Sequence, residues 1–214
     1  MNYKFKYRLF GRSKGRSKNN KLIEKAIKMQ LKTIDKTKYN IIDIGPGYGE
    51  STLEISKFNS DKIVIACEKY IDGLNNIAKK IKNVDANNVR LFQGNVHQLL
   101  DENCPDNSIS EIWILFPDPW PKKKHYKRRL INYDFFLKIK KYLKKDSIIH
   151  IATDSRAYIS EILFNVHKIK NDFQWLNQSK KEWDYVNLSL PDTKYFQKAL
   201  KKGFNPFYLK LKKL

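Results

Sequence analysis

A short glycine-containing run follows the first strongly apolar segment of the sequence, in Ile41-Ile-Asp-Ile-Gly-Pro-Gly-Tyr-Gly49. Its glycines allow a sharp backbone turn and let a ligand approach without meeting a Cβ atom. The dinucleotide pattern G-x-G-x-x-G is not met, because Glu50 stands at its sixth position. The spacing favours an adenosyl ligand without a pyrophosphate, bound at Gly45 and Gly47. Asp43 is then placed to hold the positive amino group of a methionine moiety, although a turn or capping carboxylate is the alternative interpretation.

Two more polar residues come at the ends of later apolar segments. Glu68 ends the run KIVIACE, about 20 residues beyond the glycines, where an acid accepts hydrogen bonds from both ribose hydroxyls. Asn95 follows the run RLFQG and is placed to receive an adenine edge. Each residue alone is a weak signal, but together with Asp43 they predict a nucleoside pocket.

The most informative stretch is Phe116-Pro-Asp-Pro-Trp-Pro-Lys-Lys-Lys-His-Tyr-Lys-Arg-Arg129. Prolines flank Asp118, so this carboxylate sits on a stiff loop that suits the orientation of a reacting base. Trp120 offers an aromatic face of the kind that holds an extruded base. Six of the eight residues 122–129 are Lys or Arg, interleaved with two rings. This block predicts a phosphate-binding edge, with a solvated charge run as the alternative.

The elements that must position these residues alternate along the chain. Apolar runs predict strands at 39–44, 62–68, 89–93, 111–116, 147–153, 173–175 and 207–211. Helical spacing predicts helices at 21–36, 49–58, 71–81, 133–143 and 156–167. Alternating strands and helices with short connections indicate an α/β fold, in which a mostly parallel sheet carries helices on both faces. Ligands bind such sheets at the carboxyl ends of the strands, where all the residues above fall.

Length, charge and residue composition restrict the possible partners, domains and location of the protein. The 214 residues carry a net charge of +21, which raises affinity for polyanions such as nucleic acid. We expect residues 1–20 to form a flexible basic arm that contacts RNA and residues 21–214 to form a single domain. The start lacks a signal peptide, and no apolar run is long enough to span a bilayer, so we expect a cytoplasmic protein without membrane attachment. The two cysteines and four histidines show no ligand spacing, so we expect no metal.

The sequence resembles the bacterial tRNA (guanine-N7-)-methyltransferase family. The motifs that carry the resemblance are IIDIGPGYGES, the Glu of ACEKY, FPDPWPKKKHYKRR, ATDSRAY and PDTKYFQKALKKG, and they span nearly the whole chain. FPDPW followed by a basic block is the most specific of them. The resemblance implies a Rossmann-like class I methyltransferase with a seven-stranded sheet, which transfers a methyl group from S-adenosylmethionine to N7 of a guanine in tRNA. It further suggests position 46, in the variable loop, and it leaves monomer and homodimer both open.

The resemblance also implies roles for particular residues. Asp43, Glu68 and Asn95 match cofactor-binding positions, the last of which is usually acidic in the family. Asp118 matches a residue assigned to both cofactor binding and catalysis. The implied RNA-contacting residues are Lys124, His125, Tyr126, Lys127, Arg128 and Arg129.

The implied substrate-binding positions lie farther along the chain. They are Lys122, Asp154 and Thr193, the last of which opens the family's C-terminal T-x-[FY]-E motif. Here the sequence departs from the family, because Phe196 stands where a Glu is common.

Other classes of protein fit less of the sequence. A nicotinamide dehydrogenase is disfavoured by Glu50 and by the basic excess. A non-enzymatic RNA-binding protein would explain the charge but not the glycine turn or the acids at strand ends. An adenine amino-methyltransferase usually carries [ND]-P-P-[YF] at the place of Phe-Pro-Asp-Pro-Trp, which is similar in position but different in order.

Overall fold

The computed structural model describes residues 21–84 and 86–214. The basic segment 1–20, which the sequence predicts to be a flexible RNA-contacting arm, lies outside the described residues. The chain divides into two units, Met1–Pro105 and Asp106–Leu214, and each has its own strands and helices.

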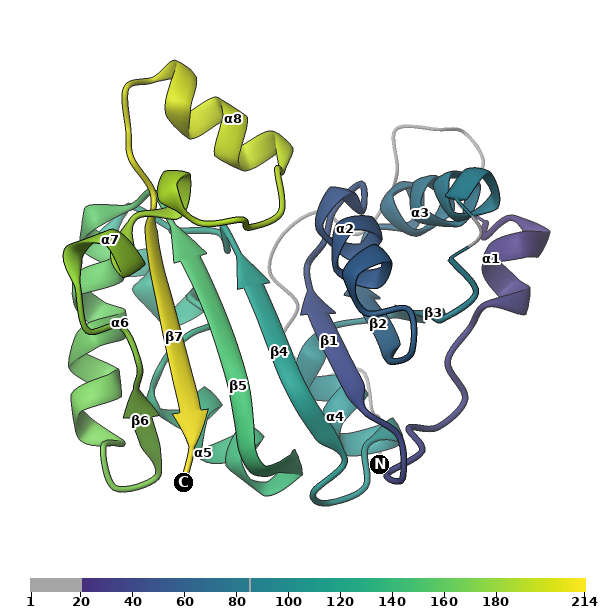
Figure 1. Cartoon of the computed structure of the whole chain (residues 1–214), viewed down its shortest axis with the longest axis horizontal. Helices are drawn as coiled ribbons and strands as arrows, with labels where there is room; N and C mark the ends of the chain where they lie inside the picture. Colours follow the sequence, from purple (N-terminus) through teal and green to yellow (C-terminus); the bar gives the residue numbers. More distant parts are fainter. Residues whose placement is uncertain (1–20, 85) are drawn as a thin grey trace. The chain divides into compact units, whose positions relative to one another are not determined.

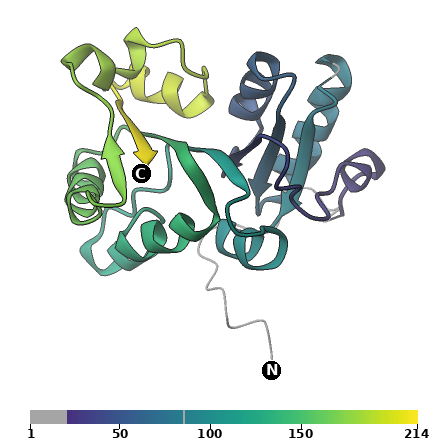
Figure 2. The ribbon, with the colours of Figure 1, turned by 60° about the horizontal axis from the view of Figure 1, so that its bottom comes forward.

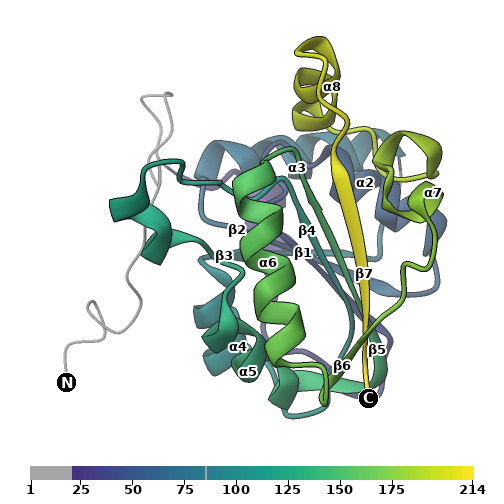
Figure 3. The same ribbon diagram turned by 90° about the vertical axis from the view of Figure 1, so that its left-hand side faces the viewer.

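The first unit contains three parallel strands in the order β3-β2-β1. Its elements are α1 (Glu24–Lys28), β1 (Asn40–Ile44), α2 (Glu50–Phe58), β2 (Ile63–Glu68), α3 (Ile71–Val84), β3 (Val89–Gln93) and α4 (Val96–Asn103). The register pairs Ile44 with Cys67 and Glu68 with Gln93, so the three strands end side by side. Helices α2 and α4 lie on opposite faces of these strands (Figures 1 and 3). Buried aliphatic residues such as Ile42, Ile65 and Leu91 hold the layers together.

The first helix is much shorter than its sequence pattern predicts. The pattern extends over residues 21–36, but α1 ends at Lys28. Beyond it the chain pairs with the edge of the sheet, because the Leu31 N–H donates to the Leu91 carbonyl at 2.8 Å and the Leu91 N–H donates to the Met29 carbonyl at 2.9 Å. Backbone pairing with an unpaired strand edge therefore overrides helical periodicity here.

The second unit contains strands in the order β4-β5-β7-β6. Strands β4 and β5 are parallel, whereas β7 runs antiparallel to both β5 and β6. Its elements are β4 (Ile109–Leu115), η2 (Lys123–Arg128), α5 (Tyr133–Tyr142), β5 (Leu143–Thr153), α6 (Arg156–Lys168), β6 (Phe173–Trp175), α7 (Lys180–Trp183), η3 (Tyr185–Asn187), α8 (Lys194–Lys201) and β7 (Phe207–Lys213). Helices α5 and α6 lie on one side of these strands and α7 on the other (Figures 2 and 3).

One face of the second unit's strands carries a buried polar network. The Glu111 carboxylate accepts hydrogen bonds from the Trp113 indole N–H at 2.6 Å and from His150 Nε2 at 3.0 Å. His150 Nδ1 lies 2.6 Å from the Tyr208 hydroxyl oxygen, and the His150 ring stacks on Trp113 with centroids 3.8 Å apart. Burial lowers the pKa of His150, so its ring is neutral near pH 7. The network links β4, β5 and β7.

Candidate active site

The glycine turn after β1 provides open space beside the backbone. Gly45 and Gly47 have φ values of 71° and 58°, and a Cβ atom added at either would meet nothing within 4 Å. Gly49 also has a positive φ, but a Cβ there would lie 2.3 Å from Ile77 Cγ1. The first two glycines therefore leave room for a ligand, whereas the third allows α3 to pack closely.

Asp43, at the end of β1, is a fully buried carboxylate with only one satisfied oxygen. Its Oδ2 accepts hydrogen bonds from the Ser51 hydroxyl at 2.6 Å and the Thr52 hydroxyl at 2.8 Å. Its Oδ1 has no hydrogen-bond partner among the residues that the structure describes. Burial, with a smaller contribution from the charge of Glu68, raises the pKa of Asp43 to about 6. A buried carboxylate oxygen without a partner suits a cationic group such as the ammonium of S-adenosylmethionine.

Glu68 ties the end of β2 to the glycine turn. Its Oε2 accepts a hydrogen bond from the Gly47 N–H at 2.9 Å, and its Oε1 accepts one from the Tyr70 N–H at 2.8 Å. Glu68 thus orders the turn, a role that the sequence did not predict in addition to the expected ribose contact.

Asn95 serves as the N-cap of α4. Its Oδ1 accepts a hydrogen bond from the Gln98 N–H at 2.9 Å. The residue lies next to the end of β2, since the Gly94 N–H donates to the Glu68 carbonyl at 3.1 Å. The structure therefore places Asn95 beside the other predicted donor-binding residues, with its side-chain oxygen already used in the cap.

The sequence prediction missed Gly73, which supports the glycine turn from α3. A Cβ atom at this position would lie 2.3 Å from the carbonyl oxygen of Gly47. Backbone atoms cannot yield as a flexible side chain can, so any larger residue must displace the turn. The available sequence signal is the glycine near the start of the predicted helix, in Ile71-Asp-Gly73. Glycine destabilises a helix, so its presence there indicates that a larger side chain would not fit.

Replacement of Gly73 by Ala should weaken binding of S-adenosylmethionine about tenfold, because the added methyl group pushes the Gly47 carbonyl out of the turn. Equilibrium binding with labelled cofactor measures the effect. Ala78, fully buried on the same helix, provides the control: an Ala78→Gly variant removes a methyl group from α3 away from the turn and should keep the wild-type affinity. Unchanged affinity of the Gly73→Ala variant would contradict the supporting role.

In the second unit, Asp118 lies on the loop that follows β4. The side chain is exposed, while Phe116 and Trp120 on either side adopt left-handed backbone conformations with φ values of 54° and 42°. The Phe116 N–H donates to the Ala152 carbonyl of β5 at 2.8 Å, which fixes the beginning of the loop. Non-glycine residues with positive φ persist only where the surroundings enforce them, so this loop is held in one conformation.

The basic block forms the short 3-10 helix η2, which extends away from the strands of the second unit (Figure 3). Lys124 and Lys127 are exposed on this helix, as is Lys122 directly before it. The guanidinium of Arg128 lies over the Trp120 ring at 4.9 Å, and the His125 ring meets Trp120 edge-on at 5.8 Å. The Trp120 ring therefore already contacts two residues of the basic block, which the sequence pattern did not predict.

Arg129 differs from the rest of the block because it is only 2% exposed. Its side chain points back into the unit, where Nε donates to the Pro119 carbonyl at 2.8 Å and Nη1 pairs with Glu161 of α6. The sequence grouped Arg129 with the RNA-contacting residues. The structure separates it from them, because a side chain buried in this way offers no surface to RNA.

The remaining predicted substrate-binding residues also belong to the second unit. Asp154 is half-buried directly after β5, which is the neighbour of β4, so it lies at the same sheet edge as the Asp118 loop. Thr193 is buried and caps α8, since its hydroxyl oxygen accepts a hydrogen bond from the Phe196 N–H at 3.1 Å. Phe196, at the position where the resemblance implies a Glu, packs against Tyr185 with ring centroids 4.7 Å apart.

Neither a metal-binding cluster nor a membrane-spanning helix occurs in the described part of the chain, residues 21–84 and 86–214. No group of three or more His, Cys, Asp or Glu side chains within it could hold a metal ion. None of the helices within it has the length and apolar character that a bilayer crossing requires.

Comparison with known proteins assigns this fold to one class of enzyme. A family model described as "Putative methyltransferase" matches residues 37–209. An rRNA methylase from Streptococcus thermophilus has a similar structure, with a TM-score of 0.53 at 15% sequence identity, over 89% of this chain and 93% of that chain. The fold is therefore that of the class I S-adenosylmethionine-dependent methyltransferases. The predicted seven-stranded, mostly parallel sheet is confirmed.

Relatives with higher sequence identity identify the family within this class. The tRNA (guanine-N7-)-methyltransferase of Ruegeria pomeroyi is 34% identical over 173 residues, which is 81% of this chain and 72% of that protein. The tRNA (guanine-N7-)-methyltransferase of a second Ruegeria species is 33% identical over 168 residues, 78% of this chain and 65% of that protein. The chain belongs to the tRNA (guanine-N7-)-methyltransferase family. The resemblance stated from its motifs is confirmed.

Proposed function

We propose that this chain transfers the methyl group of S-adenosylmethionine to N7 of a guanine in tRNA. Membership of the tRNA (guanine-N7-)-methyltransferase family is the observation that carries the proposal, since the match runs through both units. One family model covering residues 37–209 also supports the expectation that residues 21–214 act as a single methyltransferase domain.

Apart from Asp118, which the family match links to both cofactor binding and catalysis, the donor-binding residues belong to the first unit. Asp43 would receive the ammonium group at its unpartnered Oδ1, and Gly45 and Gly47 would let the methionine moiety lie against the backbone. Glu68 would accept hydrogen bonds from the ribose hydroxyls while it holds the Gly47 N–H. Asn95 would face the adenine, with its cap to Gln98 limiting how its amide can turn.

The reaction asks little acid–base chemistry of the protein. When bound, S-adenosylmethionine supplies an electrophilic methyl group on a sulfonium centre. Guanine N7 has a free in-plane lone pair and carries no proton, so no strong general base is needed. The residues of this chain therefore contribute mainly by alignment of the base and by exclusion of water.

Two carboxylates of the second unit fit the acceptor side. Asp118 would accept hydrogen bonds from the N1–H and amino edge of guanine, because its carboxylate is exposed on a loop of fixed conformation. Positive charge develops on the base during transfer, and Asp118 and Asp154, at the ends of neighbouring strands, would stabilise it.

The basic block would dock the tRNA backbone without reading its sequence. Lys122 would meet the substrate next to the reacting base, and the exposed or half-buried residues of the block would contact phosphates farther out. These residues are Lys124, His125, Tyr126, Lys127 and Arg128. Desolvation and the neighbouring cations Arg128, Lys122 and Lys127 lower the pKa of His125.

Incubation of unmodified tRNA with labelled S-adenosylmethionine tests the proposal directly. We expect label in the RNA, and chemical cleavage at 7-methylguanine should map it to one nucleotide, with position 46 of the variable loop as the expected site. A tRNA in which that guanine is replaced by adenine serves as the matched control and should remain unlabelled. Retention of the cofactor without any labelled tRNA would overturn the proposal, and label at an adenine amino group would move the chain to another methyltransferase activity.

A further inference from the structure

The loop that carries Asp118 is under backbone strain at both ends. Phe116 and Trp120 adopt positive φ values of 54° and 42° on either side of Pro117-Asp118-Pro119. Such conformations are unfavourable for residues other than glycine and need support from surrounding contacts. The Phe116 N–H supplies that support at the beginning of the loop through its hydrogen bond to Ala152. The end of the loop needs an anchor of its own.

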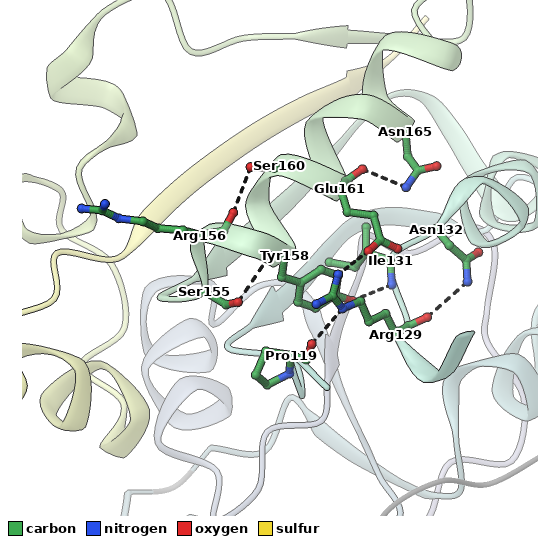
Figure 4. A network of polar contacts seen from close by, with 10 residues as sticks. All are labelled: Pro119, Arg129, Ile131, Asn132, Ser155, Arg156, Tyr158, Ser160, Glu161 and Asn165. Carbon is green, nitrogen blue, oxygen red and sulfur yellow. Dashed lines mark hydrogen bonds and ion pairs between the residues drawn. The ribbon is translucent and has the colours of Figure 1, made fainter. Parts of the chain in front are cut away.

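Arg129 provides a contact at that end of the loop. Its Nε donates to the Pro119 carbonyl at 2.8 Å, one peptide unit away from Asp118 (Figure 4). A carbonyl on an irregular loop has no strand or helix ladder to pair with, so a side-chain donor at this point determines where the peptide lies. A buried guanidinium adds strength, since hydrogen bonds from ionised donors are about twice as strong as neutral ones.

Glu161 of α6 fixes Arg129 in turn. Its Oε2 pairs with Arg129 Nη1, and Figure 4 shows the guanidinium between Pro119 and Glu161. The Tyr126 ring lies 3.6 Å from the guanidinium carbon and the Tyr158 ring 5.0 Å from it. Tyr158 is itself fixed, because its hydroxyl oxygen accepts a hydrogen bond from the Ile131 N–H at 2.9 Å. A buried arginine held in this way has little freedom left.

We infer that Arg129 and Glu161 are positioning residues for the proposed methyl transfer, because together they hold the Pro119 peptide and thereby place the Asp118 carboxylate. This inference rests on the proposed function for its catalytic part. Arginine suits the role because its planar fork serves two acceptors in different directions at once. A lysine at 129 keeps the charge but lacks the fork, so it satisfies Glu161 or Pro119 and not both.

Steady-state kinetics with tRNA tests the positioning role. Arg129→Lys should lower kcat about 30-fold, because small misplacements of a catalytic group are costly, while KM for tRNA and affinity for S-adenosylmethionine change less than about threefold. Glu161→Gln, which keeps the shape and an acceptor oxygen, should lower kcat about tenfold. The Glu161→Gln variant still tests the positioning role if the Arg129→Lys variant folds poorly.

A matched variant separates positioning from loss of stability. Ile162→Val shortens a fully buried side chain of the same helix α6 without touching the loop. We expect it to lower the melting temperature without lowering kcat. If Ile162→Val and Glu161→Gln lower kcat to the same extent at equal losses in melting temperature, the two residues act only on stability and the inference is wrong.

Limited proteolysis supplies a readout that does not depend on activity. Trypsin cleavage after Lys122, Lys123 and Lys124, mapped by mass spectrometry, reports opening of the loop, and cleavage after Lys201 serves as the internal reference. Arg129→Lys should raise the rate of cleavage after Lys122, Lys123 and Lys124 about tenfold relative to the rate of cleavage after Lys201. An unchanged ratio would contradict the anchoring even if the wild type methylates tRNA. A raised ratio with an inactive wild type would support the anchoring and refute the proposed function instead.

Discussion

Replacement of Asp118 by Ala should lower kcat for tRNA methylation by about a hundredfold to a thousandfold, the usual range for loss of one preorganised polar contact to the reacting group. Affinity for S-adenosylmethionine should change less than about threefold, since the other donor-binding residues belong to the first unit. The side chain is exposed, so its removal should leave the melting temperature nearly unchanged. Single-turnover kinetics and equilibrium cofactor binding measure the two effects separately.

The Asp118→Asn variant distinguishes orientation from charge. The amide retains an acceptor oxygen, so a milder loss than that of Asp118→Ala would indicate that the carboxylate mainly orients guanine. Equal losses would indicate that its negative charge stabilises the transition state. Asp106→Asn is the matched control, because Asp106 is an exposed acid of the same unit that pairs with Lys141 at 3.3 Å. A comparable loss of cofactor affinity and kcat in Asp118→Ala would show a binding role in place of a catalytic one.

Binding of S-adenosylmethionine should depend on pH through Asp43. Burial raises the pKa of this carboxyl to about 6, and an ammonium at the unpartnered Oδ1 requires the ionised form. The dissociation constant should therefore fall about tenfold as the pH rises from about 5 to about 7, with a proton released on binding at the acid end. Isothermal titration calorimetry in buffers of different ionisation enthalpy measures both quantities.

Stability of the cofactor-free protein should change with pH in the opposite direction. The folded state holds a proton on Asp43 up to about pH 6, whereas the unfolded chain loses it near its ordinary pKa of 3.8. The folded state therefore binds more protons within this window, and the contribution of Asp43 to the free energy of unfolding falls as the pH rises through it.

The Asp43→Asn variant is the control for the pH dependence of cofactor affinity and for the pH dependence of stability. It keeps an acceptor for Ser51 and Thr52 but cannot ionise, so its cofactor affinity should be weaker and independent of pH over this range. A wild-type dissociation constant that is flat between about pH 5 and about pH 7 would contradict the assignment of the ammonium group to Asp43.

The fold was predictable from the sequence where its periodicity is local. The parallel strands and the helices that join them follow from apolar runs and helical spacing, and α2, α5 and α6 begin and end within a residue or two of the expected positions. The predictions failed where tertiary contacts decide. Pairing of Leu31 with Leu91 shortens α1. Helices α4 and α8, which follow the N-cap residues Asn95 and Thr193, were not predicted.

The candidate site was predictable as a set of residue types at strand ends, and only partly as a set of contacts. Spacing identified Asp43 and Glu68, and the structure brings both to the glycine turn. It could not show that Glu68 holds the Gly47 N–H, or that Gly73 and Glu161 support the two loops from distant helices. Such contacts join segments far apart in the chain, and a single sequence contains no record of them. Arg129 illustrates the limit, since a basic run does not reveal which of its members points inward.

Apart from Asp118, which the family match links to both roles, the proposed donor-binding residues precede residue 106, and the proposed acceptor-binding residues follow it. Evolution can therefore alter the choice of nucleic-acid target by drift in one half of the chain while the half that handles the methyl donor stays intact. At Phe196 a ring packed on Tyr185 stands where the resemblance implies a carboxylate, while the glycine turn retains its motif. An engineer who wishes to redirect methylation has a natural boundary for recombination near Pro105.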